Sequence, residues 1–411
     1  MSDPQQDYDE LKAAGLTLDL TRGKPSSAQL DLAAPMLDLP GSELVRAADG
    51  SDTRNYGNVA GLPELRALFA PFLQVPVAQL IASNNSSLEL MHDTLVHALL
   101  SPLPGAPVRW ADAGRVAFLA PVPGYDRHFA VCERLGIDLV SVPMTADGPD
   151  MDEVERLVAD DPSIKGIWCV PKYSNPDGAV YSDEVVRRLA AMPTAAPDFR
   201  IMWDNAYSVH HLTEEEPELA DVLALAAEAG NPDRPFVFGS TSKITFAGAG
   251  VAFLGASEAN VAWWLTLTEK RTIGPDKINQ RRHALFLRDG DGLRAHMAAH
   301  RELIAPKFAV VEKLLTDAFA DTPGVSWTTP KGGYFVALTV PDGLASQVVA
   351  LAKDAGIVLT PAGATHPYGK DPHDALIRLA PTLPPLADVE GAMAGVVTCV
   401  RLALARAGTR A

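Results

Sequence analysis

One lysine stands where nucleophilic chemistry is expected. Lys243 follows the apolar run 236–238, lies next to hydroxyl residues, and precedes a loop with two glycines and a second apolar run at 251–254. Apolar neighbours at the end of a strand lower the pKa of a lysine and free its amine to attack a carbonyl, as in Schiff-base formation. The alternative is a surface lysine that merely follows a strand.

The elements around this lysine alternate between strand and helix. The pattern predicts strands at 115–119, 138–142, 166–170, 200–203 and 236–238, and helices at 126–135, 152–158, 182–191 and 219–228. Such alternation is typical of an α/β fold with a mostly parallel sheet, whose ligands gather at the carboxyl ends of the strands.

Further polar residues follow these strands, so one edge of the sheet should collect them. They are Tyr125, Asn175, Asp204 and Tyr207. Each has an ordinary structural explanation: Tyr125 as a packed aromatic, Asn175 as a turn former in Asn-Pro-Asp-Gly, Asp204 as a helix cap, and Tyr207 as a residue at the rim of the core. Their joint position at one edge favours a binding site.

A serine pair precedes a helical pattern near residue 88. Ser86 and Ser87 come before Leu88, Met91 and Leu95, whose spacing marks one face of a helix. The N-terminus of a helix attracts phosphate through its free N–H groups and its dipole. A plain N-cap is the alternative reading of the same serines.

Three regions of the chain are expected. Residues 1–50 are expected to form an N-terminal arm and part of a small domain, 51–285 a large domain that contains the candidate binding site, and 286–411 a C-terminal small α+β domain. The polar start is expected to be disordered, with a short strand at 16–20. Strands are predicted at 334–340, 356–360 and 376–380, and a closing helix runs to about residue 404.

Composition excludes several classes of function. The 411 residues are 47% hydrophobic and carry a net charge of −16, which disfavours nucleic acid and anionic membranes as partners. The three cysteines lie far apart without metal-binding spacing, and the start of the chain lacks the pattern of a secretory signal. We therefore expect a cytoplasmic protein without a metal.

Taken together, these residues resemble the fold-type I pyridoxal-phosphate (PLP) enzymes, specifically the class I aminotransferases. The resemblance spans about residues 20–383, and its specific parts are Ser240-x-Ser242-Lys243 and Asn175-Pro-Asp-Gly178. Within that group the chain looks most like the bacterial MocR-like branch of aspartate aminotransferases. The implied fold is a large domain with a mostly parallel sheet plus a smaller α+β domain.

The resemblance implies how PLP is held. Lys243 would form the Schiff base and shuttle a proton, Asp204 would pair with the pyridinium nitrogen, and Tyr125 would stack on the ring. The remaining cofactor contacts implied are Tyr207 and Asn175 on the ring oxygen, Ser86, Ser87, Ser240 and Ser242 on the phosphate, and Tyr56 from the neighbouring subunit of a homodimer.

On the substrate side, the resemblance assigns Arg378 to the α-carboxylate, with Asn175 and Gly23 beside it. A surface ion pair is the alternative for Arg378. Three candidates remain open for a distal substrate carboxylate: Arg22, Arg271 and Lys277.

One departure from the family concerns the phosphate. Class I enzymes usually carry an arginine seven or eight residues after the Schiff-base lysine, and this chain has Gly250 and Val251 there. Substitutes for the missing cation are sought among Arg22, Lys24, Arg54 and Lys277.

Other signals favour structural roles. Gly248-Ala249-Gly250 lacks the third glycine of a dinucleotide fingerprint. His296 and His300 have a spacing that could hold a metal but lack the accompanying glutamate, so a solvated helix face is expected. The basic stretch 281–283 is expected to be an interface or a cluster beside the cofactor.

The sequence thus predicts a homodimeric PLP-dependent aminotransferase that acts on amino acids and 2-oxo acids, with aspartate and 2-oxoglutarate as the leading pair. One alternative keeps the fold and changes the reaction to β-elimination. Another is a non-catalytic effector-sensing domain of the MocR type. That reading needs a winged-helix head, and only about fifty residues precede the loop of Tyr56.

Overall fold

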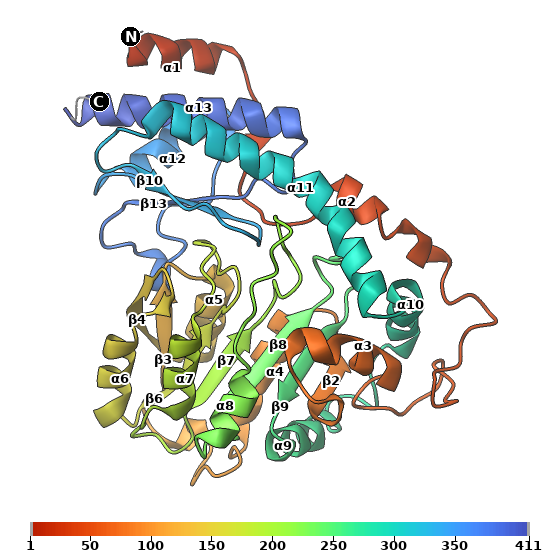
Figure 1. The fold of residues 1–411 in the computed structure, drawn as a ribbon. Coiled ribbons are helices and arrows are strands. Elements are labelled where there is room, and N and C mark those ends of the chain that lie inside the picture. Colours follow the sequence, from red (N-terminus) through yellow and green to blue (C-terminus); the bar gives the residue numbers. More distant parts are fainter. Residues whose placement is uncertain (1–2, 409–411) are drawn as a thin grey trace.

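A mixed sheet of eight strands forms the centre of the computed structural model, which describes residues 3–408 (Figure 1). The strand order is β2-β9-β8-β7-β6-β3-β4-β5. The bounds are β2 Leu80–Ser83, β3 Ala117–Val122, β4 Asp138–Thr145, β5 Gly148–Pro149, β6 Ile164–Cys169, β7 Arg200–Asp204, β8 Pro235–Ser240 and β9 Ala252–Ala256. Strands β4, β3, β6, β7 and β8 are parallel, whereas β9 and β5 are antiparallel to their neighbours. The predicted α/β class is confirmed.

Both faces of this sheet are buried, which explains why its strands read as continuous apolar runs. Consecutive residues of β7 alternate between two cores: Ile201 and Trp203 pack on one face and Met202 on the other. The helices that cover the faces and edges are α3 Pro63–Leu73, α4 Ser87–Leu100, α5 Asp126–Leu135, α6 Met151–Asp160, α7 Asp183–Ala191, α8 Val222–Glu228, α9 Glu258–Thr268 and α10 Lys277–Leu287. The prediction of a helix at 126–135 is confirmed at both ends.

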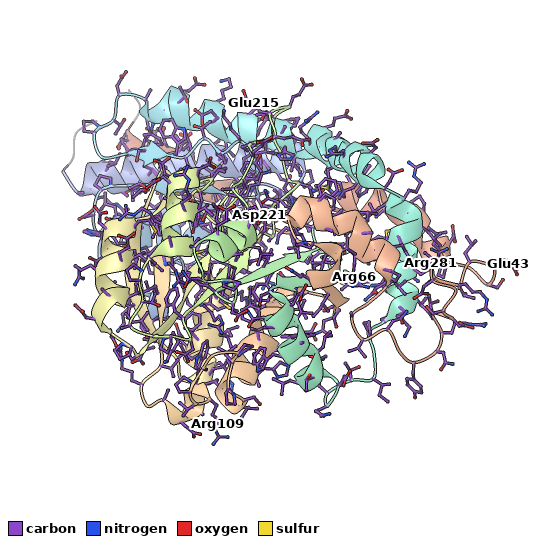
Figure 2. The ribbon with its side chains drawn as sticks, turned by 60° about the horizontal axis from the view of Figure 1, so that its bottom comes forward. Glu43, Arg66, Arg109, Glu215, Asp221 and Arg281 are labelled. Carbon is purple, nitrogen blue, oxygen red and sulfur yellow. The ribbon has the colours of Figure 1, made fainter. Side chains whose placement is uncertain are left out.

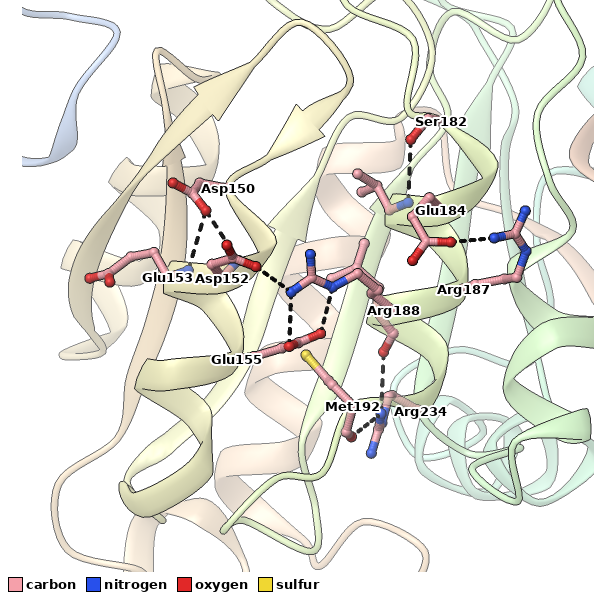
Figure 3. Close-up of polar contacts among 12 residues, drawn as sticks. Asp150, Asp152, Glu153, Glu155, Ser182, Glu184, Arg187, Arg188, Met192 and Arg234 are labelled. Atoms are coloured by element: carbon pink, nitrogen blue, oxygen red, sulfur yellow. Dashed lines mark hydrogen bonds and ion pairs between the residues drawn. The ribbon is translucent and has the colours of Figure 1, made fainter.

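Figure 3 shows the N-terminal cap of α6 and an ion-pair cluster that joins α6 to α7. Asp150 caps α6 by accepting hydrogen bonds from the backbone N–H groups of Asp152 and Glu153. Arg188 of α7 reaches across to Asp152 at 2.6 Å and to Glu155 at 2.8 Å. Because exposed ion pairs contribute little, the cap and the buried apolar faces dominate here.

A further core, separate from the two on the faces of the large sheet, belongs mainly to the C-terminal region and the N-terminal arm. Strands β10, β11 and β13 form an antiparallel sheet, and β1 pairs with β12 in parallel. The elements of this region are α1 Pro4–Ala13, β1 Leu18–Asp19, α2 Ser27–Asp31, η1 Ala34–Asp38, α11 Gly290–Phe319, β10 Ser326–Trp327, β11 Val336–Thr339, α12 Ala345–Asp354, β12 Ile357–Val358, η4 Pro367–Gly369, β13 Leu376–Leu379 and α13 Leu386–Arg406. Two further 3-10 turns, η2 Val77–Gln79 and η3 Trp110–Asp112, belong to the large sheet region.

The expectation of a disordered start is wrong. Helix α1 lies along α13, so the two ends of the chain are close together in Figure 1. Asp3 caps α1, and the buried Tyr8 donates a hydrogen bond to the carbonyl of Leu351. A few apolar residues among polar ones are enough to attach α1 to α13, far away in the sequence. The local composition of α1 does not reveal this attachment.

The strand predicted at 356–360 is shorter than expected and pairs with the arm instead of the three-stranded sheet. The three domain boundaries remain predictions.

Within residues 3–408, no helix is long and apolar enough to cross a membrane. Cys132, Cys169 and Cys399 are buried free thiols.

Candidate active site

A cavity of about 200 Å³ opens at the carboxyl ends of the parallel strands. Its lining residues are Ser86, Ser87, Leu88, Tyr125, Val170, Asn175, Asp204, Ala206, Tyr207, Ser240, Ser242 and Lys243. The cavity therefore brings together every candidate cofactor residue from the sequence except Tyr56. A larger groove of about 840 Å³ contains neither Lys243 nor Asp204, and we place the candidate site in the smaller cavity because it holds the reactive groups.

Lys243 follows β8, and its amine lies near two aromatic rings. Its Nζ atom lies 5.0 Å from the ring centroid of Tyr207 and 5.8 Å from that of Tyr334. Burial lowers the pKa of Lys243, and the negative charge of Asp204 opposes part of this shift. A larger fraction of the amine is therefore uncharged and nucleophilic at neutral pH.

A buried histidine, His283, contacts the turn that carries this lysine. Thr241 and Thr245 place their hydroxyls 3.0 Å and 2.8 Å from Nε2 of His283, whose Nδ1 donates to the carbonyl of Asn279 at 2.8 Å. Burial lowers the pKa of His283 to about 4, so the ring is neutral and can accept the hydroxyl protons. The sequence predicts a basic cluster at 281–283, whereas the structure shows His283 as a buried support of the turn that carries Lys243.

The other side of the turn contacts His296 and His300, and the expectation of a solvated helix face is wrong for both. His296 donates to the carbonyl of Ile244 at 2.7 Å and lies 3.1 Å from His300. His300 in turn accepts from Gln29 of the N-terminal arm at 3.1 Å. Helix α11 faces the core here, and only long-range packing decides that orientation. Among the described residues, no cluster suited to a metal ion occurs.

Asp204 ends β7 and has one oxygen without a partner. The side chain is buried, and its Oδ2 accepts a hydrogen bond from His128 at 3.0 Å. His128 stacks on Trp168 with ring centroids 4.2 Å apart and planes at 7°. Oδ1 of Asp204 is buried without a hydrogen-bond partner in the described part of the chain. Such an unpaired acceptor in a cavity is expected to meet a donor from a bound group.

His128 is a site residue that sequence reasoning missed. It follows Tyr125 by three positions at the start of α5, so both side chains lie on the same side of the first turn. The two rings meet edge to face at 4.9 Å. The i, i+3 spacing behind Tyr125 was the signal that could have identified it.

Two more groups line the cavity between Asp204 and Lys243. Burial raises the pKa of Tyr207 well above its ordinary value, so its phenol keeps the proton and can donate a hydrogen bond. Asn175 is buried, and its Oδ1 lies 3.5 Å from Nη1 of Arg378.

Serine hydroxyls and the N-terminal end of a helix also line the cavity. Ser86 caps α4, with its hydroxyl accepting from the backbone N–H of Glu89 at 3.3 Å, and Ser87 is the first residue of the helix. Ser240 and Ser242 come from the end of β8 and the turn after it. This end is suited to an anion such as phosphate.

The backbone leaves no room for a side chain at the position where the family carries its arginine. A Cβ atom on Gly250 would lie 2.9 Å from the carbonyl of Asn85 and 3.1 Å from the hydroxyl of Ser242. The neighbouring Val251 is buried in the core.

None of the four proposed substitutes lines the cavity. Arg22 and Lys24 are exposed, Arg54 pairs with its neighbour Asp52 at 2.6 Å, and Lys277 donates to the carbonyl of Gly57 at 2.9 Å. Lys243 is the only cationic side chain among the residues that line the cavity.

Arg378 reaches this region from β13 of the C-terminal sheet. It is only 8% exposed, and its Nη1 donates to Asp126 at 2.9 Å. Its Nε atom is buried and has no hydrogen-bond partner among residues 3–408. The guanidinium lies 5.1 Å from the ring centroid of Phe335, and a Cβ atom on Gly23 would lie 2.3 Å from that ring. Glycine is therefore required where the arm passes Phe335.

Tyr56 is the one predicted cofactor residue that the single chain does not bring to the cavity. Its side chain is 78% exposed on the loop before α3.

Comparisons with known proteins agree over nearly the whole chain. A family model described as aspartate amino-transferase matches residues 1–410. A Mycolicibacterium smegmatis protein, assigned by name only provisionally to the aminotransferases, is 60% identical over 98% of this chain and 95% of its own. An aspartate aminotransferase of Corynebacterium glutamicum is 49% identical over 98% of this chain and 93% of its own.

Solved structures give the same result for the fold. An aspartate transaminase from Corynebacterium glutamicum superposes with a TM-score of 0.97 at 49% identity, covering 98% of this chain and 95% of the other. An alpha-aminoadipate aminotransferase from Thermus thermophilus, complexed with N-(5'-phosphopyridoxyl)-L-leucine, superposes with a TM-score of 0.76 at 19% identity, covering 99% and 96%. The second likeness concerns the fold alone.

Proposed function

Because this chain belongs to the aspartate aminotransferase family and is an aminotransferase, we propose that it transfers the amino group of L-aspartate to 2-oxoglutarate with PLP as its cofactor. The observation that carries the cofactor assignment is the buried, unpaired Oδ1 of Asp204 in the same cavity as the amine of Lys243. A protonated pyridine nitrogen would satisfy that oxygen, and an aldehyde would meet the amine. The residues present therefore fit PLP.

Each end of the cavity suits one part of the cofactor. Lys243 would hold PLP as a Schiff base, and bound PLP supplies an electron sink for the substrate's Cα. Asp204, supported by His128, would keep the ring nitrogen protonated, because a buried carboxylate favours a positive charge next to it. Tyr125 would cover one ring face, and Tyr207 with Asn175 would bind the ring oxygen.

The phosphate would be held by neutral donors. Ser86 and Ser87 at the start of α4, with Ser240 and Ser242, offer hydroxyls and backbone N–H groups to the dianion. This arrangement replaces the cation that Gly250 and Val251 cannot provide.

The chain's own groups would then orient the substrate and move its proton. Arg378 would bind the α-carboxylate through donors such as its unpaired Nε, with Asn175 and Gly23 beside it. Once displaced from the cofactor, the Lys243 amine would take the proton from Cα, and its lowered pKa suits it to act as a base.

The preference for aspartate is supported by the name of the Corynebacterium glutamicum relative. Among the candidates for a distal carboxylate, Arg271 pairs with Asp93 at 3.1 Å and Lys277 is bonded to Gly57, whereas Arg22 is exposed.

We also propose membership of the MocR-like branch, supported by the motif series, and action in a reducing cytoplasm, which suits the three buried free thiols.

A homodimer is part of this proposal. Exposed apolar side chains occur on η1 and the loop before α3, and on α10 and the segment that leads into it. These segments touch, because Lys277 bonds to Gly57 and Arg281 bonds to the carbonyl of Leu44. Figure 2 shows this loop at the edge of the molecule, with Glu43 outermost and Arg281 beside it. The apolar residues are Leu37, Leu44, Tyr56, Ile273 and Ile278. A patch of this kind favours a partner, and a second copy would bring Tyr56 to the neighbouring phosphate site.

The test uses the PLP-loaded protein and two variants. L-Aspartate should convert the absorbance of the lysine-bound cofactor to that of its amino form, and 2-oxoglutarate should restore it. Borohydride reduction followed by peptide mapping should place the pyridoxyl group on Lys243. Lys243→Ala should lose both results, and the control Lys270→Ala, an exposed lysine, should keep them. Absence of any response to amino acids would contradict the proposal.

A further inference from the structure

An ion pair joins the candidate substrate arginine to the large sheet region. Arg378 lies on β13, and its partner Asp126 is the first residue of α5. The bond from Nη1 to Oδ1 is 2.9 Å long, and the aspartate side chain is 34% exposed against 8% for the arginine. Figure 1 shows α5 next to the sheet that contains β13.

This pairing already gives the guanidinium a carboxylate before any substrate binds. Nη1 donates to Asp126 and lies 3.5 Å from Oδ1 of Asn175, whereas Nε is buried without a partner in the part of the chain that the structure describes. A substrate carboxylate that uses the Nε side would leave Arg378 with a negative group on both sides.

The helix that carries Asp126 is bonded to the segment that precedes β13. The residue is the first of α5, and two positions earlier the N–H of Gly124 donates to the carbonyl of Thr365 at 2.8 Å. Farther along the same region, the N–H of Tyr368 donates to Glu133 of α5 at 3.0 Å. These two contacts, one just before α5 and one near its C-terminal end, hold the helix against the segment that precedes β13 and keep the backbone of Asp126 close to the strand of Arg378.

We propose that Asp126 is a built-in competitor that weakens the binding of every substrate α-carboxylate at Arg378. Without substrate, Asp126 compensates a buried positive charge, whose loss would be costly. With substrate bound, the two carboxylates repel each other across one guanidinium. Removing the charge of Asp126 therefore costs more free energy in the substrate-free protein than in the complex. Substrate binding then becomes tighter. The inference rests on the proposed function, because it takes Arg378 as the carboxylate-binding group.

The consequence is a site whose affinity for an α-carboxylate is lower than Arg378 alone would give. Substrates and products share the same α-carboxylate, so weaker binding of one also speeds the release of the other. Raising KM with kcat unchanged is the expected effect of a group that acts equally on the ground state and the transition state. Asp126 touches Arg378 and acts through it, so it is a positioning and affinity-setting residue.

The test compares Asp126→Asn with a matched control in the PLP-loaded protein. Asparagine keeps an oxygen for Nη1 and removes the charge. The control is Asp183→Asn, because Asp183 is also the first residue of a helix, is exposed, and has the same effect on a helix dipole. Succinate, which does not react, is titrated by calorimetry.

We expect Asp126→Asn to bind succinate about three- to tenfold more tightly than wild type, and Asp183→Asn to bind it equally. KM for L-aspartate and for 2-oxoglutarate should fall by a similar factor, and kcat should not rise. As a second readout, the reaction rate with aminooxyacetate should increase relative to that with methoxyamine, which lacks a carboxylate. A structural role alone would not separate these two reagents.

Two failures can be told apart. Unchanged or weaker succinate binding in Asp126→Asn, while Arg378→Ala loses binding, overturns the role of Asp126 and leaves the proposed function intact. Unchanged binding in Arg378→Ala overturns the assignment of Arg378 and with it this inference. Equal gains with aminooxyacetate and methoxyamine would also contradict the inference, because the gain would not depend on a carboxylate.

Discussion

Replacing His283 by glutamine should make the protein less sensitive to acid. The imidazole is fully buried, its Nε2 lies within hydrogen-bond distance of the hydroxyls of Thr241 and Thr245, and its Nδ1 donates to the carbonyl of Asn279. Glutamine can donate and accept at similar places but does not titrate. The histidine therefore differs from its replacement mainly in its ability to take up a proton.

The magnitude follows from the difference in pKa between the folded and unfolded chains. Burial lowers the pKa of His283 from 6.5 to about 4, so the unfolded chain binds more protons between these values. The contribution of His283 to stability is therefore complete above pH 6.5 and is lost as the pH falls toward 4. Between pH 7.5 and pH 5.5 this loss is about 1.3 kcal/mol, and His283→Gln should not suffer it.

The assay is urea denaturation of the cofactor-free proteins at both pH values. All other titrating groups are common to wild type and variant, so the difference between their pH-dependent losses isolates His283. His373→Gln is the control, because this histidine is exposed and its pKa is raised by Asp342. On acidification, His373→Gln should lose at least as much stability as wild type. An equal loss in wild type and His283→Gln would refute the buried, neutral state of His283.

Two further predictions concern the cofactor. Asp204→Asn should still fold, because the amide oxygen of the asparagine can accept a hydrogen bond from His128. The half-reaction with L-aspartate should slow about 10²- to 10³-fold, because a fixed negative charge is lost. Stopped-flow absorbance measures this rate. Tyr56→Phe should weaken PLP binding about tenfold, because one hydrogen bond to the phosphate is lost. Spectral titration measures the PLP affinity. An unchanged affinity would contradict a shared site.

The sequence was sufficient to predict the sheet edge and the groups that lie there. Parallel strands end at the same edge, so residues that follow different strands, such as Asn175, Asp204 and Lys243, had to converge. The start of α4 at Ser87 was equally local, because a polar cluster before a helical face indicates an N-terminus.

Other features could not be read from local patterns. The spacing of His296 and His300 placed them on one face of a helix, but which face of α11 would be buried depended on the arm and on the lysine turn. His283 shows the same limit, since two arginines beside it suggested an exposed basic cluster. Helix α1 was missed because its few apolar residues find their partners at the other end of the chain.

The sequence by itself determined which reactive groups the protein carries and that they follow strands, because hydrophobic periodicity and turn residues act over short distances. The tertiary structure alone decided that Arg378 meets Asp126, 252 positions away, that Asp204 keeps one oxygen unpaired, and that His283 lies beneath Lys243. Charge compensation, desolvation and hydrogen-bond satisfaction depend on neighbours in space, and chain folding supplies those neighbours from distant segments.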